Sequence, residues 1–312
     1  MTRTEDWSGL ESAPRWIVTF TGAYLFLGLL ALYVWCVAAP TLSMQMPASG
    51  AEALSVTGMA AAQAWLCLLA LRCFQPGAPL RRAWLLITLS AASSAIGGLA
   101  AQVLGTAWLL NPLGRTDSAP IQRIHGIAVI LSGPVQMALL AAGLLAALRV
   151  LRRFGFWVRP KPTGWAVAGI LILFGLYRFG ETATALAGKH FTAAGAISLS
   201  RNLLLCALSL EALFLWLSAA RMGRGLIAKC WRAFAMGIFV IGFGEAALWA
   251  IGRYFPGWLV ASLEWYVWFP AAAAFALAPA HCVAAVRRAT GRATQSSSDL
   301  PVSVFPPAVP AN

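Results

Sequence analysis

Apolar residues run almost uninterrupted along this chain, in stretches separated by short polar segments. Each stretch holds roughly 20 residues or more, which is enough to cross a bilayer as an α-helix. Because hydrocarbon offers no water to backbone amides, such stretches must be helical. The alternating pattern of outer-membrane barrel strands does not occur. The pattern therefore predicts an all-α protein with eight spans, over residues 16–38, 53–73, 83–110, 121–148, 164–188, 193–219, 231–252 and 257–284.

The composition leads to the same fold class. Hydrophobic residues make up 60% of the chain and charged residues 11%, with a mean hydropathy of +0.75. A soluble domain carries roughly a quarter charged residues, so a soluble fold is excluded. We expect a polytopic membrane protein, a bundle of about eight transmembrane helices surrounded by the lipid bilayer.

Basic residues are distributed unevenly between alternate loops. Of the 23 Lys and Arg, two, Arg178 and Arg201, lie deep within spans. The other 21 lie in loops, in terminal segments or at span ends, with 17 on one side of the predicted membrane and four on the other. An excess of basic residues marks cytoplasmic loops. Both termini are therefore predicted to be cytoplasmic, in a multi-pass protein of the bacterial inner-membrane type. Topology and anionic lipid headgroups explain the net charge of +13 better than binding to nucleic acid does.

The chain divides into three segments by composition. Residues 1–15 form a cytoplasmic N-terminal segment, and residues 16–288 form the transmembrane domain. Residues 289–312 are rich in Ser and Pro and lack periodicity, which predicts a disordered cytoplasmic tail. Acidic residues precede the first span, whose apolar stretch is too long for a cleaved signal peptide, so we expect this span to be retained.

Acidic residues are scarce, and several of them lie within the membrane, where an ionisable side chain is most costly. The chain has ten Asp and Glu in total, and four of them, Glu181, Glu211, Glu245 and Glu264, fall within predicted spans. An ionisable side chain at the centre of a membrane helix costs about 2.5–3.5 kcal/mol even on the lenient insertion scale. Such residues usually face a ligand, a proton or an ion, so they are the first candidates for a site.

Most of these groups are expected at one depth. With both termini inside, the predicted spans place the following residues in the outer half of the membrane: Arg178, Glu181, Arg201, Asn202, Glu245 and Glu264. Arg178 and Glu181 are three residues apart and share a helix face. We expect a nearly balanced ion network that binds a ligand or a proton. The alternative is a buried network that only sets helix register. Glu211 lies nearer the cytoplasmic side.

Other residues border this layer. Arg123 and His125 are expected at the mouth of a pocket on the outer face. Pro134 and Pro270 lie within spans and predict kinks, because proline removes a backbone donor. Residues 179–191 also align without gaps on residues 243–255, with Glu181 opposite Glu245, at an offset of one helical hairpin. We interpret this as a possible parallel repeat of 164–219 and 231–284; similar small residues would also arise from close helix packing.

The predicted function is binding or translocation of a small polar or amphipathic ligand in a Glu/Arg pocket open to the outer face, with a proton on one carboxylate as a candidate coupling ion. Two alternatives stay open. One is a membrane enzyme acting on a lipid-linked substrate, with a Glu as general base. The other is a non-catalytic sensor or subunit that needs a protein partner. No catalytic motif occurs, so an enzyme is the weaker reading, and no metal or cofactor is expected.

Overall fold

The computed structural model describes residues 12–38, 42–110, 126–128, 130–187, 193–255 and 257–298, and all regular elements in these residues are helical. They are α1 (Ala13–Ala38), α2 (Leu42–Arg72), α3 (Arg81–Leu110), the π-helical turn η2 (Leu131–Val135), α5 (Gln136–Arg153), α6 (Pro162–Leu186), α7 (Ala193–Arg221), α8 (Leu226–Gly252) and α9 (Gly257–Ser298). Seven helical segments in the described residues are long and apolar enough to cross a membrane. The chain is a multi-pass helical membrane protein, as the hydropathy pattern predicts.

The helices extend past several of the predicted span limits. α2 begins at Leu42 rather than at residue 53, and α8 begins at Leu226 rather than at residue 231. α9 continues to Ser298, so residues 289–298, where the composition predicts disorder, are helical. The helix can continue through this segment because a helix already formed in the membrane needs no new nucleus. Residues 299–312 lie outside the described part of the chain.

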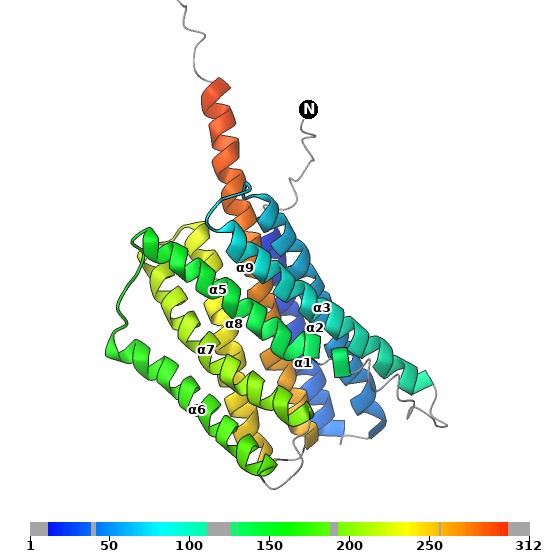
Figure 1. The fold of residues 1–312 in the computed structure, drawn as a ribbon. Helices are drawn as coiled ribbons and strands as arrows, with labels where there is room; N and C mark the ends of the chain where they lie inside the picture. Colours follow the sequence, from blue (N-terminus) through cyan, green and yellow to red (C-terminus); the bar gives the residue numbers. More distant parts are fainter. Residues whose placement is uncertain are drawn as a thin grey trace, which may run out of the picture.

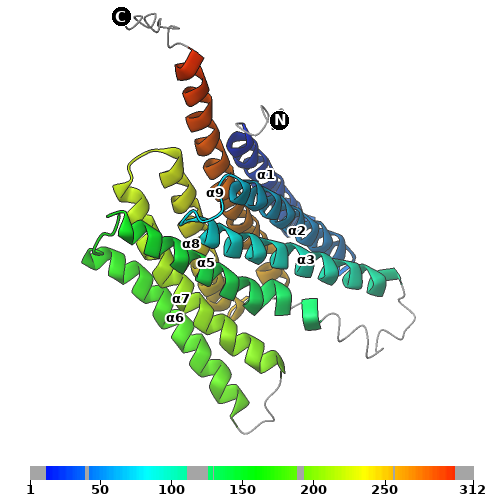
Figure 2. The same cartoon turned by 45° about the horizontal axis from the view of Figure 1, so that its top comes forward.

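α9 is the central helix of the bundle (Figure 1). It packs most extensively against α8 and α2, and also against α1. α6 lies at the periphery, where it contacts mainly α7. The N-terminal end of α1 and the C-terminal end of α9 lie at the same end of the bundle, and α9 projects beyond its neighbours there (Figure 2).

Glycines end two of the helices at the tight connections. Gly155 follows α5 and Gly223 follows α7, with φ of 78° and 84°. This left-handed region is costly for residues with a Cβ and open to glycine. At the first of these turns the Phe156 N–H donates to the Leu151 carbonyl, 3.0 Å away, which caps the end of α5. α6 begins with Pro162 in its first turn, where no backbone donor is needed.

Aromatic and small side chains share the core. Trp84 of α3 lies 6.0 Å from both Trp231 and Phe234 of α8, measured between ring centroids, and all three side chains are buried. Phe234 in turn contacts Phe275 of α9. Gly237 lets α8 approach the Phe275 ring so closely that a Cβ at that position would lie 2.8 Å from it. In a bilayer the hydrophobic effect does not favour the association of helices. Close packing, which small residues allow, therefore contributes more.

The peripheral helix α6 presents apolar side chains outwards. Ile170, Leu173 and Leu176 recur at a spacing of three residues and are all exposed. This spacing places them on one helix face. In a soluble protein such a face would be a large apolar patch. In a membrane it is the surface that contacts lipid.

A kink interrupts the helix that precedes α5. Gly133 adopts non-helical torsion angles (φ −108°, ψ −105°) directly before Pro134, and residues 131–135 form the π-helical turn. Serines of α3 bind the carbonyl groups near this turn: Ser93 donates to Leu131 over 2.6 Å and Ser90 donates to Gln136 over 2.8 Å. The kink predicted at Pro134 is thereby confirmed. Pro270 lies inside α9, and the kink predicted there stays a prediction.

Candidate functional site

A cavity of about 350 Å³ lies inside the bundle, between α2, α3, η2, α5, α7, α8 and α9. Its volume is in the range of small-molecule sites. Most of its wall is apolar, with residues such as Met137, Leu205 and Phe275. The polar side chains that line it are Thr57, Gln63, Ser94, Ser132, Gln136, Arg201 and Glu245. The described residues therefore line a mainly apolar, partly open cavity with a few polar groups.

One ion pair stands in the wall of this cavity. The Arg201 Nη2 group on α7 donates a hydrogen bond to Glu245 Oε1 on α8. The Arg201 guanidinium carbon also lies 5.6 Å from the ring centroid of Trp268, on α9. The side chains of Arg201 and Glu245 are 42% and 20% exposed, respectively. A cation–π contact and an ion pair thus hold the guanidinium from two sides.

Glu264 and Asn202 lie near this pair but not in the cavity wall. Glu264 interacts electrostatically with Arg201 and Glu245, yet no described residue lies within ion-pair distance of its carboxylate. Asn202 is buried, and its Nδ2 has no hydrogen-bond partner among the described residues. The carboxylate of Glu211, further along α7, also has one buried oxygen, Oε2, without a partner there.

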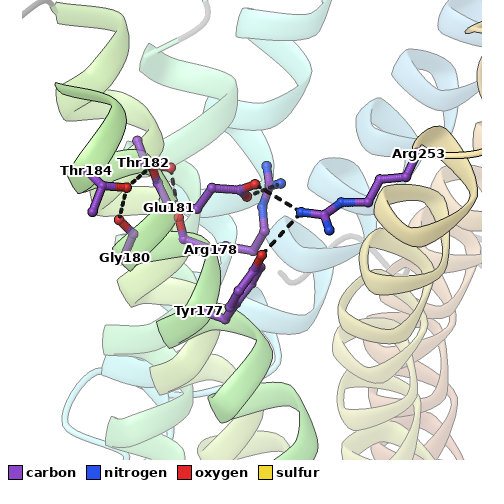
Figure 3. A network of polar contacts seen from close by, with 7 residues as sticks. All are labelled: Tyr177, Arg178, Gly180, Glu181, Thr182, Thr184 and Arg253. Atoms are coloured by element: carbon purple, nitrogen blue, oxygen red, sulfur yellow. Dashed lines mark hydrogen bonds and ion pairs between the residues drawn. The ribbon is translucent and has the colours of Figure 1, made fainter.

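A second polar cluster joins α6 to α8 (Figure 3). We call it the α6–α8 cluster; its members are Tyr177, Arg178, Glu181, Trp249 and Arg253. The Arg178 Nη1 group donates to Glu181 Oε2 over 2.9 Å, and Arg253 Nη2 lies 3.4 Å from Glu181 Oε1. Arg253 Nη2 also lies 3.2 Å from the Tyr177 hydroxyl, the contact that does most to raise the pKa of its guanidinium. Both guanidiniums lie over the Trp249 ring.

The predicted layer is therefore divided into two clusters. The pair of Arg178 with Glu181 at i,i+3 is confirmed, and Arg201 pairs with Glu245. Among the described side chains, no ion pair or hydrogen bond joins the cavity pair to the α6–α8 cluster. The reason is that Glu181 turns towards Arg253, a residue that the hydropathy pattern leaves in a loop. Arg253 stands one helical turn beyond Trp249, so its long side chain reaches back along the same face of α8.

Several predicted residues cannot be compared with the structure. Arg123 and His125, expected at the pocket mouth, lie outside the described residues. The two glutamates of the aligned segments lie on α6 and α8, and the glycines that precede them have different surroundings. A Cβ at Gly244 would collide with Val267, while a Cβ at Gly180 would meet nothing within 4 Å. The two aligned glycines thus have different packing environments. The internal repeat stays a prediction.

The uncharged polar residues of the cavity wall were missed by reasoning from charge alone. Gln63 is buried on α2, Gln136 begins α5, and Ser94 and Ser132 come from α3 and η2. An amide within an apolar span is also costly unless it is hydrogen-bonded or solvated. A search for glutamine as well as acids within the spans would have found the first two.

Comparisons with protein families, with curated proteins and with solved structures find no match for this chain.

Proposed function

We propose that this chain is an eight-span protein of a bacterial inner membrane with both termini in the cytoplasm. α1, 26 residues long, would add the first span to the seven apolar segments. The asymmetry of 17 basic residues against four in alternate loops supports this orientation. In this orientation the Arg201–Glu245 pair lies in the outer half of the membrane.

We further propose that the protein binds a small amphipathic ligand in the internal cavity. The observation that carries this proposal is the Arg201–Glu245 pair in the wall of a cavity of about 350 Å³ that is otherwise largely apolar. Charged groups within a membrane are costly, and they usually mark a ligand or ion pathway. Small-molecule sites combine an apolar wall with a few polar groups that orient the ligand. The cavity has this composition.

The architecture favours binding over catalysis. The groups in the cavity wall are an ion pair, amides and hydroxyls, and they do not form a nucleophile with an adjacent base. The ion pair suits recognition of a charged head group, and the apolar wall suits a hydrocarbon body. Passage of the ligand across the membrane would make the protein a transporter; binding alone would make it a receptor or carrier subunit.

Blocking the cavity tests the proposal without assuming the charge of the ligand. Ala272 lines the cavity, so Ala272→Phe would fill part of it with a phenyl ring. The matched control is Ala166→Phe, because Ala166 is exposed on the peripheral helix α6. Mass spectrometry of small molecules retained by the gently purified proteins should find a compound that wild type and Ala166→Phe hold and Ala272→Phe has lost. Equal retention by all three proteins would refute the assignment.

A further inference from the structure

We infer that the cavity takes a compact amphipathic organic monoanion whose head group replaces Glu245 at the Arg201 guanidinium, and that one proton enters with it. This inference rests on the proposed function, because it names the chemical class of the ligand in the same cavity. Its evidence is the arrangement of the ion pair, the Trp268 ring and the uncharged polar wall.

Among the described residues, the guanidinium of Arg201 keeps donors without an acceptor, and these donors suit an anionic head group. A guanidinium carries five N–H donors, and Glu245 accepts a hydrogen bond from Nη2 only. The Trp268 ring lies against the guanidinium and leaves donors at its edge for another acceptor. A carboxylate or monophosphate binds such an edge through two parallel hydrogen bonds. Trp268 would hold the guanidinium in place while the acceptor is exchanged.

The choice of an anion follows from which partner of the pair can lose its charge. Two like charges about 4 Å apart repel each other by about 4 kcal/mol at an effective dielectric constant of 20. An anion beside Arg201 would meet the Glu245 carboxylate, and one proton on that carboxylate would remove the repulsion. A bound cation would meet the guanidinium, which cannot be deprotonated in a protein. An anion that brings one proton therefore leaves the net charge of the Arg201–Glu245 pair at zero, whereas a cation would raise it by one and would need Glu264 as its counter-ion.

The remaining wall indicates the rest of the ligand. The apolar side chains of Met137, Leu205 and Phe275 would contact a hydrocarbon body. On the side formed by α2 and α5, Gln63 and Gln136 would donate or accept a hydrogen bond at the far end of the ligand. These amides carry no charge, so a second ionised group on the ligand would find no counter-ion there.

Other titratable groups lie near this site, and their protonation has to be distinguished from that of Glu245. Arg201 approaches it from α7 and Glu264 from α9. On α6, Arg178 and Glu181 lie beyond Trp249, one helical turn along α8 from Glu245. Glu264 is the closest competitor for the proton, so Glu264→Gln is the matched acid control. Glu181 belongs to a pair of its own with two arginines.

The experiment uses three probes that share one body and differ in the charge of the head group: hexanoate, hexan-1-ol and hexylammonium. Binding of radiolabelled hexanoate to the purified full-length protein is measured between about pH 6 and pH 8.5, where the probe is ionised. We expect saturable binding that hexan-1-ol and hexylammonium do not displace. Its Kd should rise about tenfold per pH unit, because one proton binds with the anion.

Variants test the two proposed roles, which are anchoring of the anion by Arg201 and uptake of the proton by Glu245. Arg201→Gln should weaken hexanoate binding at least tenfold. The double variant Arg201→Gln with Glu245→Gln should weaken it equally, and it leaves neither charge of the pair without its partner to disturb folding. Glu245→Gln should bind hexanoate at pH 8 at least as tightly as wild type and without the pH dependence. Glu264→Gln should keep the pH dependence. These outcomes together support the inference.

Other outcomes overturn it. Absence of hexanoate binding to wild type, binding that Arg201→Gln leaves intact, or loss of binding in Glu245→Gln would each refute the anion assignment. Displacement by hexylammonium would instead assign Glu245 as the anchor of a cation. A pH dependence that persists in Glu245→Gln and vanishes in Glu264→Gln would refute the exchange at Glu245. The proposed function survives any of these results if Ala272→Phe still loses a compound that wild type retains.

Discussion

Gly97 is a position near the cavity at which an added methyl group would meet backbone atoms of another helical segment. A Cβ at Gly97 of α3 would lie 2.7 Å from the Ala128 carbonyl oxygen and 2.7 Å from the Ser132 amide nitrogen. Both atoms belong to the backbone of the kinked helix and cannot rotate away. Gly97→Ala would therefore separate α3 from η2 by roughly half an ångström or more, to restore ordinary van der Waals distances.

That separation would act on the two hydrogen bonds that satisfy the kink. Ser93 and Ser90 donate to carbonyl groups at 2.6 Å and 2.8 Å, so a shift of this size stretches both bonds beyond their favourable range. Each such bond contributes about 1 kcal/mol, and overpacking adds about 1–3 kcal/mol of strain. We expect Gly97→Ala to lower the free energy of unfolding by about 3–5 kcal/mol, the sum of these contributions.

Reversible unfolding in mixed micelles of SDS and a mild detergent, followed by circular dichroism, measures this loss. Gly180→Ala is the matched control, because a Cβ there meets nothing within 4 Å and the position is exposed on α6. The control should be neutral or slightly stabilising, since alanine is a better helix former than glycine. If Gly97→Ala unfolds within about 0.5 kcal/mol of the control, the close approach of α3 to η2 does not stabilise the kink.

Three further predictions concern other parts of the molecule. Glu181→Gln, in the α6–α8 cluster, should leave hexanoate affinity within about twofold, because Glu181 does not line the cavity; a loss above tenfold would place the cluster in the ligand site. In intact cells a membrane-impermeant maleimide should label a cysteine introduced at the exposed Tyr254 and spare one at the exposed Arg224; the reverse pattern would invert the proposed topology. In purified protein, Cys73 should react more slowly with maleimide than the introduced Cys at Arg224 at pH 7, because burial raises the pKa of the Cys73 thiol and only the thiolate reacts. Its rate should still rise with pH after that of the exposed control has levelled off; equal pH profiles for the two, by site-resolved mass spectrometry, would contradict this.

The amino-acid sequence by itself determined the elements and the contacts that lie within one element. The apolar stretches predicted the helices, because the bilayer excludes unpaired backbone groups. The distribution of Lys and Arg predicted the orientation, which is still a proposal. The ion pair of Arg178 with Glu181 followed from spacing alone, since residues three apart on a helix share a face. Pro134 located the kink because it lacks the amide that the helix needs.

Only the tertiary structure decided which groups meet between helices. Glu245 could have paired with Arg178 or Arg201 at a similar depth, and it pairs with Arg201; Glu181 recruits Arg253 instead. The amide of Gln63 shares a cavity with this pair although it comes from a helix far away in the sequence. The physical reason is that these helices are apolar on nearly all sides, so hydropathy sets their depth and not their rotation. Rotation about the helix axis depends on close packing at positions such as Gly97 and Gly237, and it decides which side chains face each other.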